Sequence, residues 1–231
     1  MRGLHIYVGR IMMPPIRVSL FKAKRGMHHM KWLGIGLFWM VCAGLVQAES
    51  PVEAEVDAPT GIAIAAIGEL SDAHMERVRA FVQRNTSIAT RLLEPQSASG
   101  EDFSEILDTL APLRTSEHAC IVFLYAGEDT FEEHTVYRYE SGVGVVNAAL
   151  MQTEDEERYL RRLEKLTMRS VGLLLGVEMV PNPHSAMWSY RTMSDLDAMG
   201  RNYDPPSLMR LHDRARAMGI PLIERQPPRV E

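Results

Sequence analysis

The sequence predicts a single α+β domain, in which a sheet of about four to five strands packs on helices. Short apolar runs alternate with segments whose apolar residues recur at helical spacing, which is typical of mixed folds. Apolar residues make up 46% of the chain and charged residues 24%, as in ordinary globular proteins. No repeat, low-complexity tract or internal linker divides the chain. Its 231 residues therefore favour one domain with a sizeable core.

The strands are predicted from runs of β-branched and apolar residues. The clearest is ACIVFLYA at 119–126, which reads as a fully buried strand. GIAIAAI at 61–67 is a second buried candidate. The remaining candidates are 88–93, 135–139 and 143–150.

The helices are predicted from capping residues and from apolar periodicity. Ser71 caps a helix that extends to about Asn85, and a second apolar helical face covers 103–110. The longest helix is expected at 154–175, where Thr153 and Glu156 form a capping-box pattern and Gly176 follows as the C-cap. A short polar helix or turn at 194–200 and a C-terminal helix over 205–218, with proline at its start, complete the prediction.

Residues 1–48 are predicted to be a removable signal peptide with an N-terminal extension. Lys31 precedes an apolar run, and Val46-Gln47-Ala48 resembles a cleavage site, so cleavage is expected after Ala48. The alternative is a permanent N-terminal membrane anchor, for which the apolar run is short. Met27 or Met30 is a candidate for the true first residue of the translated protein. Residues 49–59 are expected to be a flexible acidic leader, and 60–231 the domain of a periplasmic or secreted protein with no stable membrane span after cleavage.

Charge and cysteine content narrow the function classes further. Residues 1–48 carry seven basic and no acidic side chains, so the remaining chain has a formal net charge of -12. An acidic domain of this kind repels phosphate backbones, which disfavours charge-driven nucleic-acid binding. After cleavage only Cys120 remains. Its apolar surroundings predict a buried, unreactive thiol.

The exported part contains no self-standing catalytic motif. Its five histidines include no HExxH pair, and the chain has no nucleophile elbow and no phosphate loop. Glu132, Glu133 and His134 could hold a cation, but they fit a solvated loop tip better. His184, in a proline-rich loop, could be a ligand but is more typical of polar surface.

Residues 163–208 resemble the active-site segment of the archaemetzincins, which are zinc-dependent metzincin peptidases. That family carries HExxHxxGxxH on a helix, then a Met-turn, and four cysteines that hold a second, structural zinc. Gly172 and Gly176 match the helix glycines, and Met187 matches the Met-turn methionine. The order of strands before the helix is similar too, so the resemblance covers roughly 60–215. It implies the metzincin fold.

The resemblance also implies that every metal ligand is lost. At the three zinc-histidine positions the chain carries Arg169, Leu173 and Met179, and at the general-base position Ser170. The structural-zinc positions are occupied by Val180, Ser185, Asp204 and Ser207. Arginine and leucine do not bind zinc, thioether is a poor donor for it, and serine is no base at neutral pH. No metal or other cofactor is therefore expected.

Arg169 is the most informative of these replacements. We expect it to pair with Glu178, with Asp197 or with a ligand carboxylate; the alternative is that it points to solvent. Leu173 and Met179 are expected to make the site more apolar. If the resemblance holds, Arg169, Leu173 and Met179 converge, and Met187 lies beneath them.

The favoured function is a pseudopeptidase that binds an extended peptide or a protein without cutting it. In active metzincins an edge strand pairs with substrate, and 143–150 resembles that strand; the loop 127–141 is a second candidate surface. One alternative is a peptidase whose ligands have moved to His134, His184, His212 or acidic residues. The other is an unrelated exported α+β domain. The sequence leaves the oligomeric state open.

Overall fold

The computed structural model describes residues 61–224. The predicted signal peptide and the whole predicted acidic leader lie before this range, as does Cys42, so those assignments stay predictions. The described residues form a five-stranded sheet in the order β2-β1-β3-β5-β4. Three neighbouring pairs are parallel and the β4–β5 pair is antiparallel. The strands are β1 (Gly61–Gly68), β2 (Thr90–Leu92), β3 (His118–Ala126), β4 (Thr135–Arg138) and β5 (Val143–Asn147).

Helices connect the strands and extend the chain beyond them. The α-helices are α1 (Asp72–Thr86), α2 (Phe103–Leu110), α3 (Glu156–Leu174), α4 (Met193–Ala198) and α5 (Pro205–Ala217). Two short 3-10 helices, η1 (Ala111–Leu113) and η2 (Ala149–Met151), follow α2 and β5. Between residues 61 and 224, no helix is long and apolar enough to cross a membrane.

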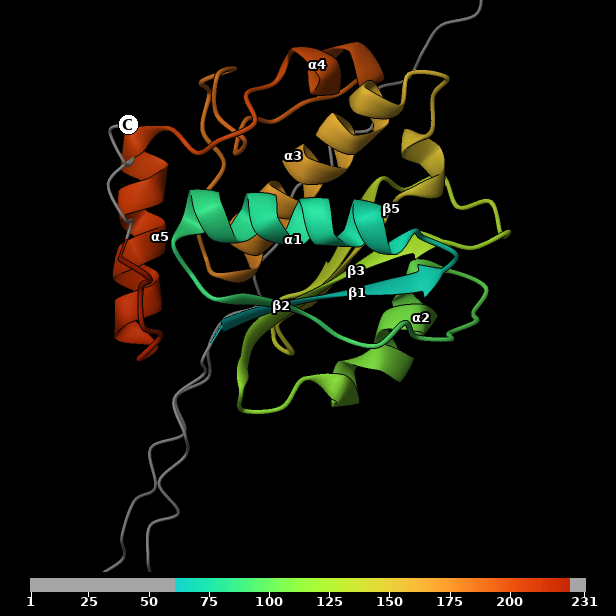
Figure 1. Ribbon diagram of the computed structural model, residues 1–231, viewed down its shortest axis with the longest axis horizontal. Helices are drawn as coiled ribbons and strands as arrows, with labels where there is room; N and C mark the ends of the chain where they lie inside the picture. Colours follow the sequence, from blue (N-terminus) through green and yellow to red (C-terminus); the bar gives the residue numbers. More distant parts are fainter. Residues whose placement is uncertain (1–60, 225–231) are drawn as a thin grey trace, which may run out of the picture. The chain divides into compact units, whose positions relative to one another are not determined.

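The sheet is sandwiched between helices, and Figure 1 shows α1 on one side of it and α2 on the other. Because side chains alternate along a strand, each buried strand contributes to two cores. Ile64 and Val122 pack in the core that contains α1 and α3, whereas Ala65 and Phe123 pack with α2. The predicted α+β domain is thus confirmed, with both faces of the sheet covered.

The predicted helices occur with shifted ends. Ser71 caps α1 as predicted, since its hydroxyl accepts the His74 N–H. The prediction of Thr153 as the cap of the long helix is wrong. The Asp155 carboxylate accepts the Arg158 N–H at 3.1 Å, so α3 begins one residue later, at Glu156.

The strand predicted over 143–150 ends early and is not an edge strand. Its last residue is Asn147, whose side-chain oxygen accepts the Leu150 N–H at 3.3 Å and turns the chain into η2. β5 is paired on both sides, with β3 and with β4, so the assignment of 143–150 to the substrate-binding edge is wrong. The edge strand on this side of the sheet is β4.

Asn147 also holds the loop that leads into β4. Its side chain is 1% exposed, and its amide donates to the carbonyls of Phe131 at 3.0 Å and Glu133 at 3.2 Å. Buried carbonyls need such donors, because an unsatisfied polar group in a core costs about 1–3 kcal/mol. One buried amide therefore fixes the position of the β4 edge strand relative to β5.

We predict that Asn147→Asp lowers the free energy of unfolding by about 2–3 kcal/mol at pH 7, because a carboxylate would face two carbonyl oxygens. Facing those oxygens raises the carboxyl's folded-state pKa above its unfolded value, so the penalty fades as the pH falls to the unfolded value of about 4. Urea titrations at several pH values measure both effects. Asn202→Asp is the control, because Asn202 is exposed. Equal stability of the two variants at pH 7 would contradict the role of Asn147.

Candidate functional site

The chain reverses direction at the end of α3 by a glycine turn. Gly176 has φ +77°, a left-handed conformation that glycine adopts without strain. Its N–H donates to the Leu173 carbonyl at 3.0 Å, and the Val177 N–H donates to the Gly172 carbonyl at 2.8 Å. These two bonds form a Schellman motif, as the predicted C-cap requires. The turn carries Met179 back alongside α3.

Met187 lies against α3, as the Met-turn resemblance predicts. It is fully buried, and its sulfur lies 2.6 Å from the point where a β-carbon on Gly172 would stand. The ring of Tyr203 lies 3.1 Å from the same point, and its hydroxyl donates to the Met168 carbonyl. A side chain at position 172 would therefore displace the loop, which explains the glycine there.

Arg169 and Met179 converge as expected, but Arg169 pairs with neither of the two acidic residues predicted for it. One terminal nitrogen of its guanidinium donates to the Trp188 carbonyl, and the other lies 2.8 Å from the Met179 sulfur. Asp197 pairs with Arg162 instead, through two bonds of 2.7 Å. Glu178 forms no ion pair with Arg169 among residues 61–224. The alternative that Arg169 points to solvent is also wrong, because the residue is only 8% exposed.

The prediction that Leu173 and Met179 make the site more apolar is only partly right. Leu173 lies one helical turn after Arg169 and packs on the core. Met179, however, is 53% exposed, because its side chain covers the guanidinium at the surface and is not inserted into the core.

Ser170, at the general-base position, is fully buried and its hydroxyl is engaged. It donates to the Leu166 carbonyl at 2.7 Å and lies 3.2 Å from the Tyr137 hydroxyl. Tyr137 reaches α3 from β4 across Gly144, where a β-carbon would stand 2.8 Å from the tyrosine ring. Burial raises the pKa of Tyr137, so the phenol stays protonated near neutral pH. This pair ties β4 to the helix and offers no group that accepts a proton from water.

Two aromatic side chains complete the surroundings of Arg169. The guanidinium lies over the Tyr190 ring, 5.5 Å from its centroid, and the His134 ring stacks on the same tyrosine, with the two ring centroids 5.7 Å apart. The His134 ring nitrogen and the Tyr190 hydroxyl are 3.1 Å apart. Burial raises the pKa of Tyr190 to about 12 and lowers that of His134. Glu132 and Glu133 are exposed as predicted for a loop tip, but His134 is half-buried because it packs on Tyr190, so the prediction of a solvated His134 is wrong.

Sequence reasoning missed Tyr137, Trp188 and Tyr190 as members of this site. No motif marks them, because they come from an edge strand and a loop that only the fold brings to α3. The other histidines lie elsewhere: His212 contacts the Thr86 carbonyl at 2.8 Å, and His184 is exposed. Cys120 is fully buried, as predicted, and burial raises its pKa to about 12, which favours the protonated thiol near neutral pH.

Two of the four positions assigned to the structural zinc, Ser185 and Asp204, are linked by a hydrogen bond. The Ser185 hydroxyl donates to the Asp204 carboxylate at 2.7 Å and accepts the Met187 N–H at 3.2 Å. Ser207 is fully buried one turn into α5, and the Val180 N–H donates to the Met187 carbonyl at 3.1 Å. The serine and aspartate thus connect the Met-turn loop to the start of α5.

Neither set of residues fits zinc. At the catalytic positions a guanidinium, which is permanently charged, lies where an imidazole ligand is needed and repels a metal cation. At the second set, one carboxylate and two hydroxyls replace four thiolates. The part of the chain that the structure describes contains no group of three or more histidine, cysteine or acidic side chains placed to hold a metal ion.

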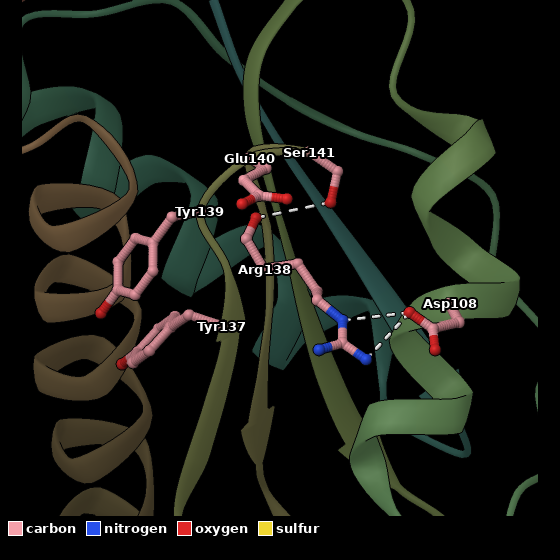
Figure 2. A pocket seen from close by; sticks show the side chains of 6 residues that line it. All are labelled: Asp108, Tyr137, Arg138, Tyr139, Glu140 and Ser141. Carbon is pink, nitrogen blue, oxygen red and sulfur yellow. Dashed lines mark hydrogen bonds and ion pairs between the residues drawn. The ribbon is translucent and has the colours of Figure 1, made fainter. Parts of the chain in front are cut away.

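A groove runs beside β4 and is lined from both faces of the strand. Figure 2 shows Tyr137 and Tyr139 on one side of it, and Arg138 turned to Asp108 of α2 on the other. Its volume is about 650 Å³. Arg138 pairs with Asp108 at 2.9 Å, and Tyr139 is 59% exposed. The groove therefore follows the free edge of the sheet.

We predict that Asp204→Asn lowers the free energy of unfolding by about 1 kcal/mol at pH 7. Burial opposes ionisation of Asp204, but the hydroxyls of Ser207 and Ser185 outweigh it and hold the pKa below its usual range. The carboxylate's contribution is present above the unfolded pKa and is lost as the pH falls through the lower, folded value, so the difference shrinks in acid. Denaturant titrations test this. Asp213→Asn, on an exposed side chain, should change stability by less than about 0.5 kcal/mol.

The sequence matches no protein-family model and no curated protein. The structure is similar to that of a zinc-dependent peptidase from Methanocorpusculum labreanum, with TM-score 0.57 and 15% identity over 65% of this chain and 100% of that one. It is also similar to archaemetzincin from Methanopyrus kandleri, with TM-score 0.57 and 15% identity over 69% of this chain and 97% of that one. A third similar structure is archaemetzincin from Archaeoglobus fulgidus complexed with malonate, with TM-score 0.52 and 15% identity over 64% of this chain and 98% of that one.

These similarities confirm the fold that the resemblance of residues 163–208 implies. The domain spans nearly the whole length of each of the three solved chains. The chain has the archaemetzincin fold, with a guanidinium and a hydroxyl where the resemblance places the first zinc ligand and the general base.

Proposed function

We propose that this protein is an exported, non-catalytic protein of archaemetzincin fold that binds an extended peptide along the free edge of β4. The proposal of export rests on the signal-peptide pattern of residues 1–48. The proposal of peptide binding rests on one observation, the open backbone of the edge strand. The solved structures of similar fold include a zinc-dependent peptidase, which supports a peptide as the class of ligand.

The direction of the backbone groups of β4 supports this binding mode. The Asn147 N–H of β5 donates to the His134 carbonyl at 2.9 Å, so position 134 faces β5. Because hydrogen-bonding direction alternates along an antiparallel pair, Val136 and Arg138 face β5 too, and Thr135 and Tyr137 face away. Within residues 61–224, no backbone partner covers these outward groups. An added strand would find them ready to pair.

The loss of catalysis is supported by the chemistry of the side chains at α3. Peptide hydrolysis of the metzincin type needs a metal-bound water and a carboxylate that takes its proton. Arg169 cannot hold the metal, and Ser170 donates its own hydrogen to a carbonyl within the helix. Strand pairing, by contrast, uses backbone groups only. Binding can therefore persist where cleavage has been lost.

We expect purified protein to contain well below one zinc per chain and to show no chelator-sensitive peptide hydrolysis. Mass spectrometry of the native protein measures the metal, and a general peptide-hydrolysis assay is run on the same sample. The quadruple variant R169H/S170E/L173H/M179H is the matched control and should gain zinc, because positions 169 and 173 are one turn apart on α3 and Arg169 already contacts Met179. Stoichiometric zinc in the natural protein would overturn the non-catalytic assignment, and His184 and His212 would then be substituted first.

Peptide binding is tested with Thr135→Pro, which removes an outward N–H without removing a bond to β5. The probe is a pool of N-acetylated random octapeptides, and the readout is the fraction retained by immobilised protein. We expect about a tenfold loss or more, because proline also blocks the approach of a strand. Thr135→Val, which keeps the N–H, should stay within about twofold. Equal retention by the proline variant would place the binding elsewhere.

A further inference from the structure

We infer that Arg169 is a recognition site for a carboxylate carried by the bound peptide. This inference rests on the proposed peptide binding along β4 and adds the chemistry that the ligand must bring.

Four charged side chains of α3 are buried, and three of them are compensated. The Arg162 guanidinium binds Asp197, and the Glu164 carboxylate binds Arg77 and Arg201. The Lys165 ammonium donates to two carbonyls at 2.6 and 2.8 Å, one of them that of Asp197, whose carboxylate also attracts it. Arg169, only 8% exposed, forms no ion pair within residues 61–224. A desolvated cation without an anion is the exception in protein interiors.

The groups around the Arg169 guanidinium are all neutral. They are the Trp188 carbonyl, the Met179 thioether and the Tyr190 ring. A guanidinium has five N–H donors, and thioether sulfur is a weak acceptor. A carboxylate that displaced Met179 would accept two of those donors in parallel and would bring the missing charge. The site therefore favours a carboxylate over any neutral group of the same size.

A peptide on β4 can reach this position. Met179, which covers the guanidinium, is 53% exposed. Tyr137 lines the groove beside β4 and also lies 3.2 Å from Ser170, the residue that follows Arg169 on α3. The groove and the guanidinium thus share one wall. The carboxylate can be the C-terminus of the peptide or an acidic side chain, and these two sources differ in how they respond to amidation.

The experiment compares two N-acetylated random octapeptide pools that differ only in their C-termini, free acid or carboxamide. Each pool is applied to the purified protein, and the retained peptides are quantified and sequenced by mass spectrometry. A C-terminal site should enrich the acid pool about tenfold over the amide pool. A side-chain site should instead enrich Asp or Glu at one position of the amide pool. In Arg169→Gln either preference should disappear while edge-dependent retention remains.

Arg169→Gln also loses the bond to Trp188 and could misfold for that reason. Two further variants separate loss of the carboxylate site from misfolding. Arg169→Lys keeps the charge and should keep most of the carboxylate preference. Met179→Leu removes only the thioether acceptor and should keep or increase it. Equal retention of acid and amide pools without acidic enrichment, or loss of the preference in Met179→Leu, would overturn this inference and leave peptide binding intact. Absence of retention from both pools would instead refute the proposed function.

Discussion

The burial of α3 is the constraint on which the rest of this structure depends. The helix is covered by the sheet, by α1 and by the chain that follows it, so most of its polar side chains have lost their water. Each buried charge then needs a partner, and the partners come from distant elements: Arg77 from α1, Asp197 from α4 and Arg201 from the following loop. These pairs add little net stability relative to a packed apolar core, but breaking one leaves a charge stranded. They therefore fix which element lies where around the helix.

Hydrogen bonds do in this chain what metal coordination is expected to do in a zinc peptidase. By the resemblance, a catalytic zinc would join the helix to the segment after it, and a structural zinc would join the Met-turn loop to the next helix. Here the Arg169 guanidinium joins α3 to the Trp188 carbonyl, and Ser185 joins the loop to Asp204. The same two connections are made without a metal. Under the proposed function, these bonds explain how the fold keeps its glycines and its buried methionine with other residues at the expected zinc positions.

The sequence was sufficient for the parts of this fold that rest on local signals. Apolar runs predicted the strands, and Ser71 and Gly176 marked helix ends through interactions within a few residues. Prediction failed where two local signals competed. Thr153 and Asp155 are both good caps, and only packing selects Asp155. It failed again for the edge strand, because 143–150 is the more apolar segment and strand order is not a local property. The partners of Arg169 were out of reach for the same reason: Trp188 and Tyr190 meet it only in the folded chain.

Catalysis and peptide binding depend on different parts of this fold, and this difference decides what can survive the substitutions. Cleavage requires particular side chains on α3, and a single change from histidine to arginine abolishes a ligand. Strand addition requires only that the outward N–H and C=O groups of β4 stay unpaired and that the strand stay in place. Asn147 and the Tyr137–Ser170 contact hold β4 in place, and neither involves a metal ligand. Under the proposed function, Arg169 places a positive charge next to that edge, where it attracts the anionic end of a bound peptide.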